Sequence, residues 1–379
     1  MPLSTEDNLR LNVMLASKVD AVRIDEGRMM VYGLSADNEA QIQLNPTCRD
    51  EQYIKQVREL LSGHVLGSPG GYPVYLKRWT RMGQMKDDSL ADLLKLGEPE
   101  AVMAVVCAAG ITNELARLAW WAAPEAEHAR RMLESQQVVN GSMGKMLADF
   151  LVEFLPFEED PYAIVRSVRL VLQGDLIDQQ TRQNLWDRGN KKNVFRIGFL
   201  VAAPDALPLE LPTRADNEQH TEALKSLCDD GNALALQLQR ILSGAGQGFI
   251  QTCETILKKP ANQEVVCALF NAIGLYFSNK SVINLEEDAT SHGQAEQDVK
   301  RLIADAESRC QDSADEAAAV LAQCPDLASD IQAIYTLAEV TDAIATPVFA
   351  RTDAIGTVMR KKLIPVTEHL FTQFSQLKG

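Results

Sequence analysis

Cationic side chains are concentrated in one segment of this 379-residue chain, residues 63–85. The segment contains no acidic residue, although the whole chain carries a formal net charge of -15 at pH 7. Ammonium and guanidinium groups bind carboxylates, phosphates and other anions through charge-assisted hydrogen bonds. The segment is therefore a candidate binding site for an anion or an acidic partner, and its candidate residues are His64, Lys77, Arg78 and Arg81.

A turn and a short helix must position these residues. Residues 68–71 (SPGG) have turn composition, and residues 73–82 after them are predicted to be helical. On a helix, Lys77, Arg78 and Arg81 would share one face, because they are spaced three and four residues apart. Three uses are open: pairing with acidic helices of the same chain, binding to a partner protein, or binding of a small anion. Internal pairing is the commonest outcome in a chain with 52 acidic residues.

The doublet Trp120-Trp121 is a second candidate, as a possible interface. Adjacent residues on a helix point about 100° apart, so one ring can lie in the core while the other lies at a rim. Tryptophan is enriched at the centres of protein interfaces. Burial between helices is nevertheless the more common use of such a ring, and both interpretations stay open.

No sequence pattern predicts catalysis, a cofactor or a metal site. Residues 141–146 (GSMGKM) resemble a phosphate loop only superficially, because the first glycine is missing and Met146 replaces the Ser or Thr that would bind magnesium. The chain has no GxGxxG, HExxH or GxSxG pattern and no His/Cys pair at metal-ligand spacing. His220, His292 and His369 are scattered, and we expect them at the surface.

Composition indicates a globular, cytoplasmic protein. Hydrophobic residues make up 46% of the chain and charged residues 23%, which is too apolar for disorder. No apolar run reaches the ~18 residues that span a bilayer, and the N-terminus lacks a secretory pattern. Seven cysteines without a CxxC pair indicate a reducing compartment. The acidic balance argues against a duplex nucleic acid partner, because phosphate binding needs a positive field.

The fold is expected to be mainly α, in three regions. Residues 1–85 are predicted to form a small α+β region with an antiparallel sheet. Residues 86–203 are predicted to form a layer of short helices, either irregular or HEAT-like. Residues 213–379 are predicted to form a helical bundle, joined to the layer by a proline-rich linker at 204–212.

Alternation of apolar and polar residues predicts the strands of the first region, at about 22–25, 30–34 and 41–44. An amphipathic helix is expected over residues 50–61, ended by Gly63. Residues 195–202 form a brief apolar run that is expected to be a strand or a buried linker. Residues 218–242 are expected to form one long helix.

Four runs of sequence resemble a known family. They are LNVMLASKVDAVRIDEG, LNPTCRDEQYIKQVRELLSGHVLGSPGGYPVYLKRWTRMGQM, LGEPEAVMAVV and LARLAWWAAPEAEHARRMLE. They resemble DsrS, an accessory "sulfur reduction protein" whose genes accompany those of dissimilatory sulfite reductase in sulfur-oxidising proteobacteria. The resemblance covers mainly the first 200 residues. It implies a cytoplasmic protein tied to the oxidation of stored sulfur, and it implies no cofactor or catalytic residue.

Two functional hypotheses follow. The first is a non-enzymatic accessory or scaffold protein that binds another protein of the sulfur-oxidation pathway and supports or regulates that pathway. The second is an enzyme or carrier for a small anionic sulfur compound, with His64 and the arginines at its site. Such a carrier would need an exposed thiol beside a cation, and Cys48, which precedes Arg49, is the best candidate in the sequence. The first hypothesis is favoured because no catalytic pattern is present.

Overall fold

The computed structural model describes residues 3–36, 38–67, 87–278, 314–349 and 356–378. The expected fold class is confirmed: the described chain is mainly α, with a small antiparallel sheet near its N-terminus. It divides into two compact units. The first unit comprises residues 1–156 with 173–177, and the second comprises residues 157–172 with 178–379. The region expected over 86–203 is thus shared between the two units.

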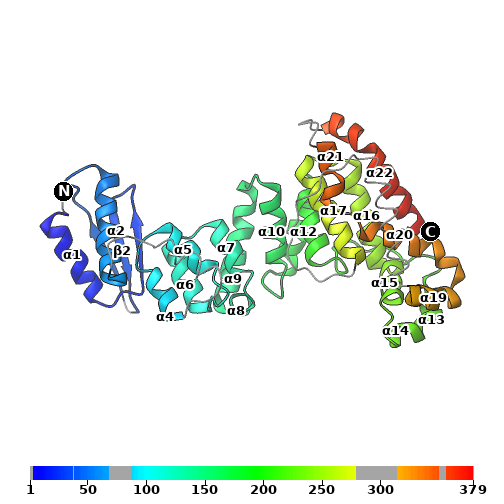
Figure 1. Ribbon diagram of the computed structural model, residues 1–379, viewed down its shortest axis with the longest axis horizontal. Coiled ribbons are helices and arrows are strands. Elements are labelled where there is room, and N and C mark those ends of the chain that lie inside the picture. The colour runs from blue at the N-terminus through cyan, green and yellow to red at the C-terminus, as the bar shows by residue number, and fades with distance from the viewer. Residues whose placement is uncertain (1–2, 37, 68–86, 279–313, 350–355, 379) are drawn as a thin grey trace. The chain divides into compact units, whose positions relative to one another are not determined.

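The sheet of the first unit has three consecutive antiparallel strands in the order β1-β2-β3. Alternating apolar residues build it, and the inward-facing Val22, Val31 and Ile42 pack into a core shared with two helices. These helices, α1 and α2, lie beside the sheet in Figure 1. The strands and helices are β1 (Ala21–Asp25), β2 (Met30–Leu34), β3 (Glu39–Gln43), α1 (Thr5–Ala16) and α2 (Asp50–Leu66).

A buried carboxylate joins α1 to α2 inside this unit. The side chain of Asp7 is fully buried and accepts a hydrogen bond from the Tyr53 hydroxyl at 2.5 Å. It also accepts one from the backbone N–H of Asn45 at 2.7 Å. A buried charge is tolerated only where several donors surround it. The two helices and the segment after β3 are therefore held in one arrangement.

The expected end of α2 is wrong. Gly63 lies inside the helix, which continues to Leu66 and ends at Gly67 in the left-handed conformation with φ of 67°. An isolated glycine costs a helix only about 1 kcal/mol, so it does not by itself end one. The true end needs a positive φ, which glycine adopts without strain.

Short helices complete the first unit, as expected. Several begin with side-chain caps; for example, Thr112 accepts a hydrogen bond from the N–H of Leu115 at 3.2 Å. The helices are α4 (Asp87–Leu93), α5 (Pro99–Val106), α6 (Asn113–Ala122), α7 (Ala126–Met132), α8 (Gln136–Val139), α9 (Ser142–Phe154) and the 3-10 turn η1 (Leu155–Phe157), whose last residue belongs to the second unit.

The described part of the second unit contains helices and connecting segments. In Figure 1 its helices α16, α17, α20 and α22 lie side by side, and these pairs are in contact. The described helices are α10 (Pro161–Val171), α11 (Gln179–Arg188), α12 (Val194–Ala202), α13 (Asn217–Ala223), α14 (Lys225–Asp229), α15 (Ala233–Leu242), α16 (Gly244–Lys258), α17 (Gln263–Ser278), α19 (Ala314–Gln323), η2 (Pro325–Leu327), α20 (Ala328–Ala338), η3 (Asp342–Ile344), α21 (Thr346–Phe349) and α22 (Gly356–Lys378).

Two local expectations about the helices of this unit are wrong. Residues 195–202 belong to the helix α12, not to a strand, because this helix is buried almost all round and therefore apolar all round. The expected long helix over 218–242 is three helices, and Gly231 with φ of 80° lies at the second break.

The proline-rich segment 204–212 is not a linker between units. It lies inside the second unit, where Asp205 pairs with Arg240 at 2.7 Å and the Ala206 carbonyl accepts from Arg182 at 2.5 Å. Proline excludes this segment from a helix, but proline does not prevent an extended segment from packing on its neighbours.

No helix in the described ranges is both long enough and apolar enough to cross a membrane.

Candidate functional site

The candidate residues of the cationic segment are only partly visible. His64 is exposed in the last turn of α2. Lys77, Arg78 and Arg81 lie outside the described residues, so their expected role in binding stays a prediction. The tryptophan doublet, the second candidate, lies within the described residues.

Trp121 has a structural role within the first unit. The guanidinium of Arg23, on β1, lies 4.9 Å from the Trp121 ring centre and 4.6 Å from that of Tyr32. Arg23 also donates to the Trp121 carbonyl at 3.3 Å, and the indole N–H of Trp121 donates to Glu39 at 3.3 Å. Stacking of a cation on aromatic faces contributes about 0.5–1 kcal/mol at a partly exposed site. Trp121 thus fastens α6 to the sheet.

Trp120 points to a different environment. Its ring lies edge-on to Phe150 of α9 with centroids 4.8 Å apart, and Phe150 stacks on Phe154 at 5.9 Å. All three rings are only partly buried. Met146, one turn before Phe150, is 51% exposed. We call these four side chains, Trp120, Met146, Phe150 and Phe154, the aromatic strip.

The helix α9 presents the strip because its apolar arc is wide. Met143, Leu147 and Leu151 are buried in the core of the unit. Met146, Phe150 and Phe154 each follow one of these residues by three positions, so they line the edge of the same apolar face. Surface helices usually carry polar residues at such partly exposed positions, so this apolar edge needs an explanation.

Paired charges border the aromatic strip. Lys145 lies 3.9 Å from Asp149 on α9, and Arg117 lies 2.6 Å from Glu114 on α6. A partly exposed apolar centre with a charged rim is the usual composition of a protein interface. Sequence analysis identified Trp120 but missed Phe150 and Phe154. The available signal was the width of the apolar arc of α9, which exceeds what one buried face needs.

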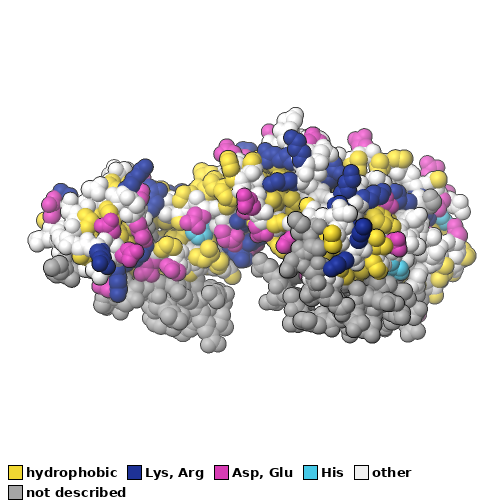
Figure 2. Space-filling view, turned by 90° about the horizontal axis from the view of Figure 1, so that it is seen from above, with side chains coloured by type: hydrophobic (Ala, Val, Ile, Leu, Met, Phe, Trp, Pro, Cys, Tyr) yellow, Lys and Arg dark blue, Asp and Glu magenta, His cyan; other side chains and the backbone are white. Residues whose placement is uncertain are grey.

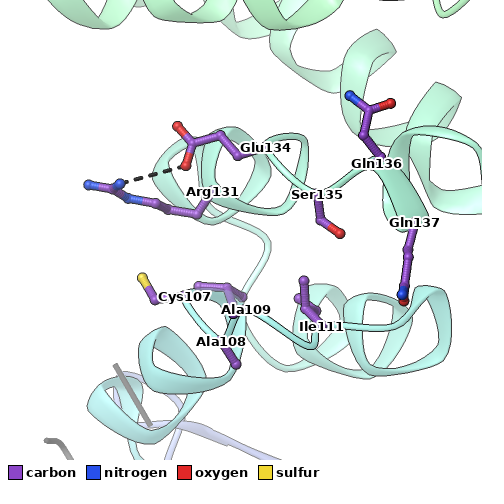
Figure 3. Close-up of a pocket in the computed structure, with 10 residues that line it drawn as sticks. Cys107, Ala108, Ala109, Ile111, Arg131, Glu134, Ser135, Gln136 and Gln137 are labelled. Atoms are coloured by element: carbon purple, nitrogen blue, oxygen red, sulfur yellow. Dashed lines mark ion pairs between the residues drawn. The ribbon is translucent and has the colours of Figure 1, made fainter. Parts of the chain in front are cut away.

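A pocket of 490 Å³ lies elsewhere in the same unit. In Figure 3 the loop after α5 and the segment from α7 to α8 face each other across it. Arg131 there pairs with Glu127 at 3.0 Å and with Glu134 at 3.7 Å. The lining residues are Val106, Cys107, Ala108, Ala109, Ile111, Arg131, Glu134, Ser135, Gln136 and Gln137.

The cysteines differ in access. Cys107, at the pocket, is exposed, whereas Cys48 is partly buried against the core of the first unit. Cys48 is also 3.9 Å from the amide nitrogen of Gln56. Burial raises the pKa of Cys253 well above its usual value, because the thiolate is desolvated. A reactive thiol is therefore better placed at Cys107 than at the expected Cys48.

The expectation of surface histidines is wrong for His220. Its side chain is 1% exposed, and its Nε2 lies 3.2 Å from Asp216 and 3.4 Å from Asp326. His369 is partly buried, and desolvation lowers its pKa. Within the described ranges, no three His, Cys, Asp or Glu side chains are grouped as a metal site would require. His292 lies outside these ranges.

Comparison of the chain with protein families, with curated proteins and with solved structures gave no match.

Proposed function

We propose that this chain is a cytoplasmic, non-enzymatic accessory protein that binds another protein through the aromatic strip and thereby supports or regulates the oxidation of stored sulfur. The observation that carries the binding role is the partly exposed row of Trp120, Phe150 and Phe154 with Met146. The sulfur setting rests on the resemblance to DsrS.

The chemistry of the aromatic strip suits a protein partner better than a small ligand. Tryptophan, phenylalanine and methionine are over-represented at the centres of protein interfaces. None of the four strip residues lines the pocket described above. A partner would bury apolar area there, at about 25 cal/mol per Å². The rim pairs Lys145–Asp149 and Glu114–Arg117 stay hydrated and set orientation.

Deletion and complementation in a native sulfur-storing host test the proposal. The gene is deleted, and the strain is complemented with the wild-type chain or with Trp120→Ala/Met146→Lys. We expect the wild type to restore consumption of stored sulfur and the variant to fail while it accumulates as folded protein. Leu9→Lys is the matched control, because Leu9 is 66% exposed on α1 of the same unit. Full complementation by the strip variant would contradict the role of this surface.

A second candidate function is supported by the pocket. Cys107 is exposed there, and Arg131 lines the same pocket. In this hypothesis the Cys107 thiolate attacks a terminal sulfur of a polysulfide dianion of n sulfur atoms. One S–S bond of the polysulfide breaks and one forms, which leaves a cysteine persulfide and a polysulfide dianion of n−1 atoms. The charge is conserved, and no external oxidant is needed.

Mass spectrometry separates the two candidates. The protein is incubated with polysulfide, and a mass increase of one sulfur atom, about 32 Da, is sought on Cys107. Cys253 serves as the internal control, because it is fully buried. Absence of the adduct on Cys107 would remove the carrier hypothesis and leave the accessory role unaffected.

A further inference from the structure

Basic residues are concentrated a second time in the chain, around the turn between α11 and α12. From residue 179 to residue 196 the chain has five Lys and Arg residues and a single acidic residue, Asp187. This turn belongs to the second unit, whereas the aromatic strip belongs to the first. Figure 2 shows Lys and Arg side chains gathered on one face over the part of the molecule that α10 and α12 occupy in Figure 1.

Tertiary structure adds a further basic residue to this turn. The side-chain amide of Asn193 donates a hydrogen bond to the carbonyl of Lys259 at 2.9 Å. The end of α16 is thereby held against the turn, although the two segments are 66 residues apart in the chain. We call the resulting group the α11–α12 basic cluster. Its members are Arg188, Lys191, Lys192 and Arg196, which flank the turn, and Lys259. Arg182 is not counted, because its guanidinium donates to the Ala206 carbonyl.

The fold holds part of the basic cluster rigidly. Arg196 lies over the Trp186 ring at 5.1 Å, and its Nη2 donates to the side-chain oxygen of Asn190 at 2.6 Å. Trp186 is itself 5% exposed. A guanidinium placed by stacking and by a hydrogen bond loses little entropy when it binds a ligand. Lys191 and Lys192, by contrast, are exposed and extend the positive charge toward solvent.

The charges of the basic cluster are not neutralised within the described chain. Considering the described residues, none of the five cluster members has a carboxylate at ion-pair distance. Desolvation lowers the pKa of Arg196, and the nearby charge of Asp187 only partly opposes this effect. The Nε of Arg196 and the Nη1 of Arg188 are buried without an acceptor. The cluster therefore has positive charge and hydrogen-bond donors left over.

The positive charge of the basic cluster is left without ion pairs although acidic residues outnumber basic ones in the C-terminal half of the chain. Residues 201–379 contain 25 Asp and Glu against 14 Lys and Arg. Two other arginines of the second unit are paired with carboxylates. Arg240 lies 2.7 Å from Asp205, and Arg214 contacts two aspartates. Like charges that are close together repel, so a group of unpaired cations costs stability unless a ligand offsets the repulsion.

We propose that the α11–α12 basic cluster binds a carboxylate-rich segment of a partner protein. The charge is complementary, and the cluster comes from two chain segments, so it suits an extended acidic peptide. The acidic remainder of the unit repels a long nucleic acid, whereas attraction to a short peptide acts within the Debye length of about 8 Å at physiological salt. This binding surface is independent of the aromatic strip, and its failure would leave the proposed function unaffected.

Fluorescence anisotropy with a labelled octaglutamate peptide tests the inference on the full chain. We expect the wild type to bind the peptide and the affinity to fall as salt is raised. Lys191→Glu/Lys192→Glu should weaken binding at least about tenfold, which corresponds to 1.4 kcal/mol, and Lys191→Arg/Lys192→Arg should retain it. The matched control is Lys361→Glu/Lys362→Glu, because these lysines are exposed on α22 of the same unit.

Three results would overturn the inference. The first is wild-type binding that the cluster variant and the α22 control weaken equally, since this would show a general charge effect. The second is no binding of the peptide by the wild type at low salt. The third is tighter binding of a single-stranded oligonucleotide than of the peptide, which would assign the basic cluster to a different class of partner. Thermal unfolding of each variant is measured alongside, and all three double lysine variants should unfold as the wild type does.

Discussion

Nη1 of Arg214 lies 2.6 Å from Oδ1 of Asp330, and the two side chains are only 5% and 4% exposed. The residues are 116 positions apart, so this ion pair joins the segment before α13 to α20. Arg214 also pairs with Asp216 at 2.7 Å. Burial lowers the pKa of Arg214, but the hydrogen bonds and charges of the two aspartates outweigh it, so the pKa is raised. This buried cation therefore ties the segment before α13 to α20.

Removing one member of this pair should be far more costly than removing both. Arg214→Met leaves Asp330 charged and buried, and we expect it to lower the free energy of unfolding by about 3–5 kcal/mol. Arg214→Met/Asp330→Leu should recover most of that loss. Urea denaturation of the full chain measures the free energy of unfolding of both variants. Arg10→Ala, at an exposed pair with Glu6, is the control, and its free energy of unfolding should fall by less than about 1 kcal/mol. Equal losses in the single and double variants would refute the account of a buried charge left unpaired.

Acid should destabilise the first unit through Asp7. Burial alone would raise the pKa of Asp7, but hydrogen bonds from Tyr53 and Asn45 outweigh it and hold this pKa below its usual value. The folded state therefore binds a proton at Asp7 less readily than the unfolded state does. The stability from Asp7 is complete above the unfolded-state pKa of about 3.9 and disappears as the pH falls through the lower folded-state value.

The variant Asp7→Asn separates this effect from general acid denaturation. It should lower the free energy of unfolding by about 1–3 kcal/mol at pH 7, because the buried donors lose a charged acceptor. The difference from the wild type should shrink as the pH approaches about 3. Urea denaturation at several pH values measures the difference, with Asp149→Asn, on the exposed face of α9, as the control. A difference that is constant with pH would show that Asp7 is not responsible.

Two glycines inside helices should respond in opposite ways to alanine. A Cβ at Gly63 would meet no atom within 4 Å, whereas one at Gly274 would lie 2.0 Å from the carbonyl oxygen of Val340. Gly63→Ala should therefore stabilise the chain by about 0.4–1 kcal/mol. Gly274→Ala should destabilise it by at least about 1–3 kcal/mol, because a backbone must move. Thermal unfolding compares them, and a loss of stability for Gly63→Ala would contradict the helical assignment of that position.

The sheet and most helices could be predicted because local signals determine them. Alternation over residues 22–44 predicted the three strands. Helix starts also depend on neighbouring residues, as at Asp160, whose carboxylate accepts from two N–H groups of α10. The errors have one physical origin, which is that burial is decided by distant residues. The apolar run of α12 is too continuous to distinguish a helix from a strand, because the helix is covered on almost every side, and buried His220 contacts Asp326, 106 positions away.

The residues of the candidate site were harder to predict from the sequence, because distant parts of the chain complete the site. Trp120 and Trp121 were recognised as residues with different environments, but their assignments needed Phe150 and Arg23 from other elements. Four members of the basic cluster lie within residues 188–196 and are visible in the sequence, whereas Lys259 joins them only through the contact with Asn193. Residue type indicates which groups can bind a partner, whereas tertiary contacts decide which of them remain available.

Site-directed photo-crosslinking tests the proposed protein-binding role most directly. A benzophenone amino acid replaces Met146 in the aromatic strip or, as the control, Leu9 on α1, and both chains are irradiated in the native host. We predict one dominant protein adduct from position 146, absent from position 9 and lost when Trp120→Ala is added. The same adducts from both positions, or an adduct at 146 that survives Trp120→Ala, would contradict the assignment of the aromatic strip as a binding surface.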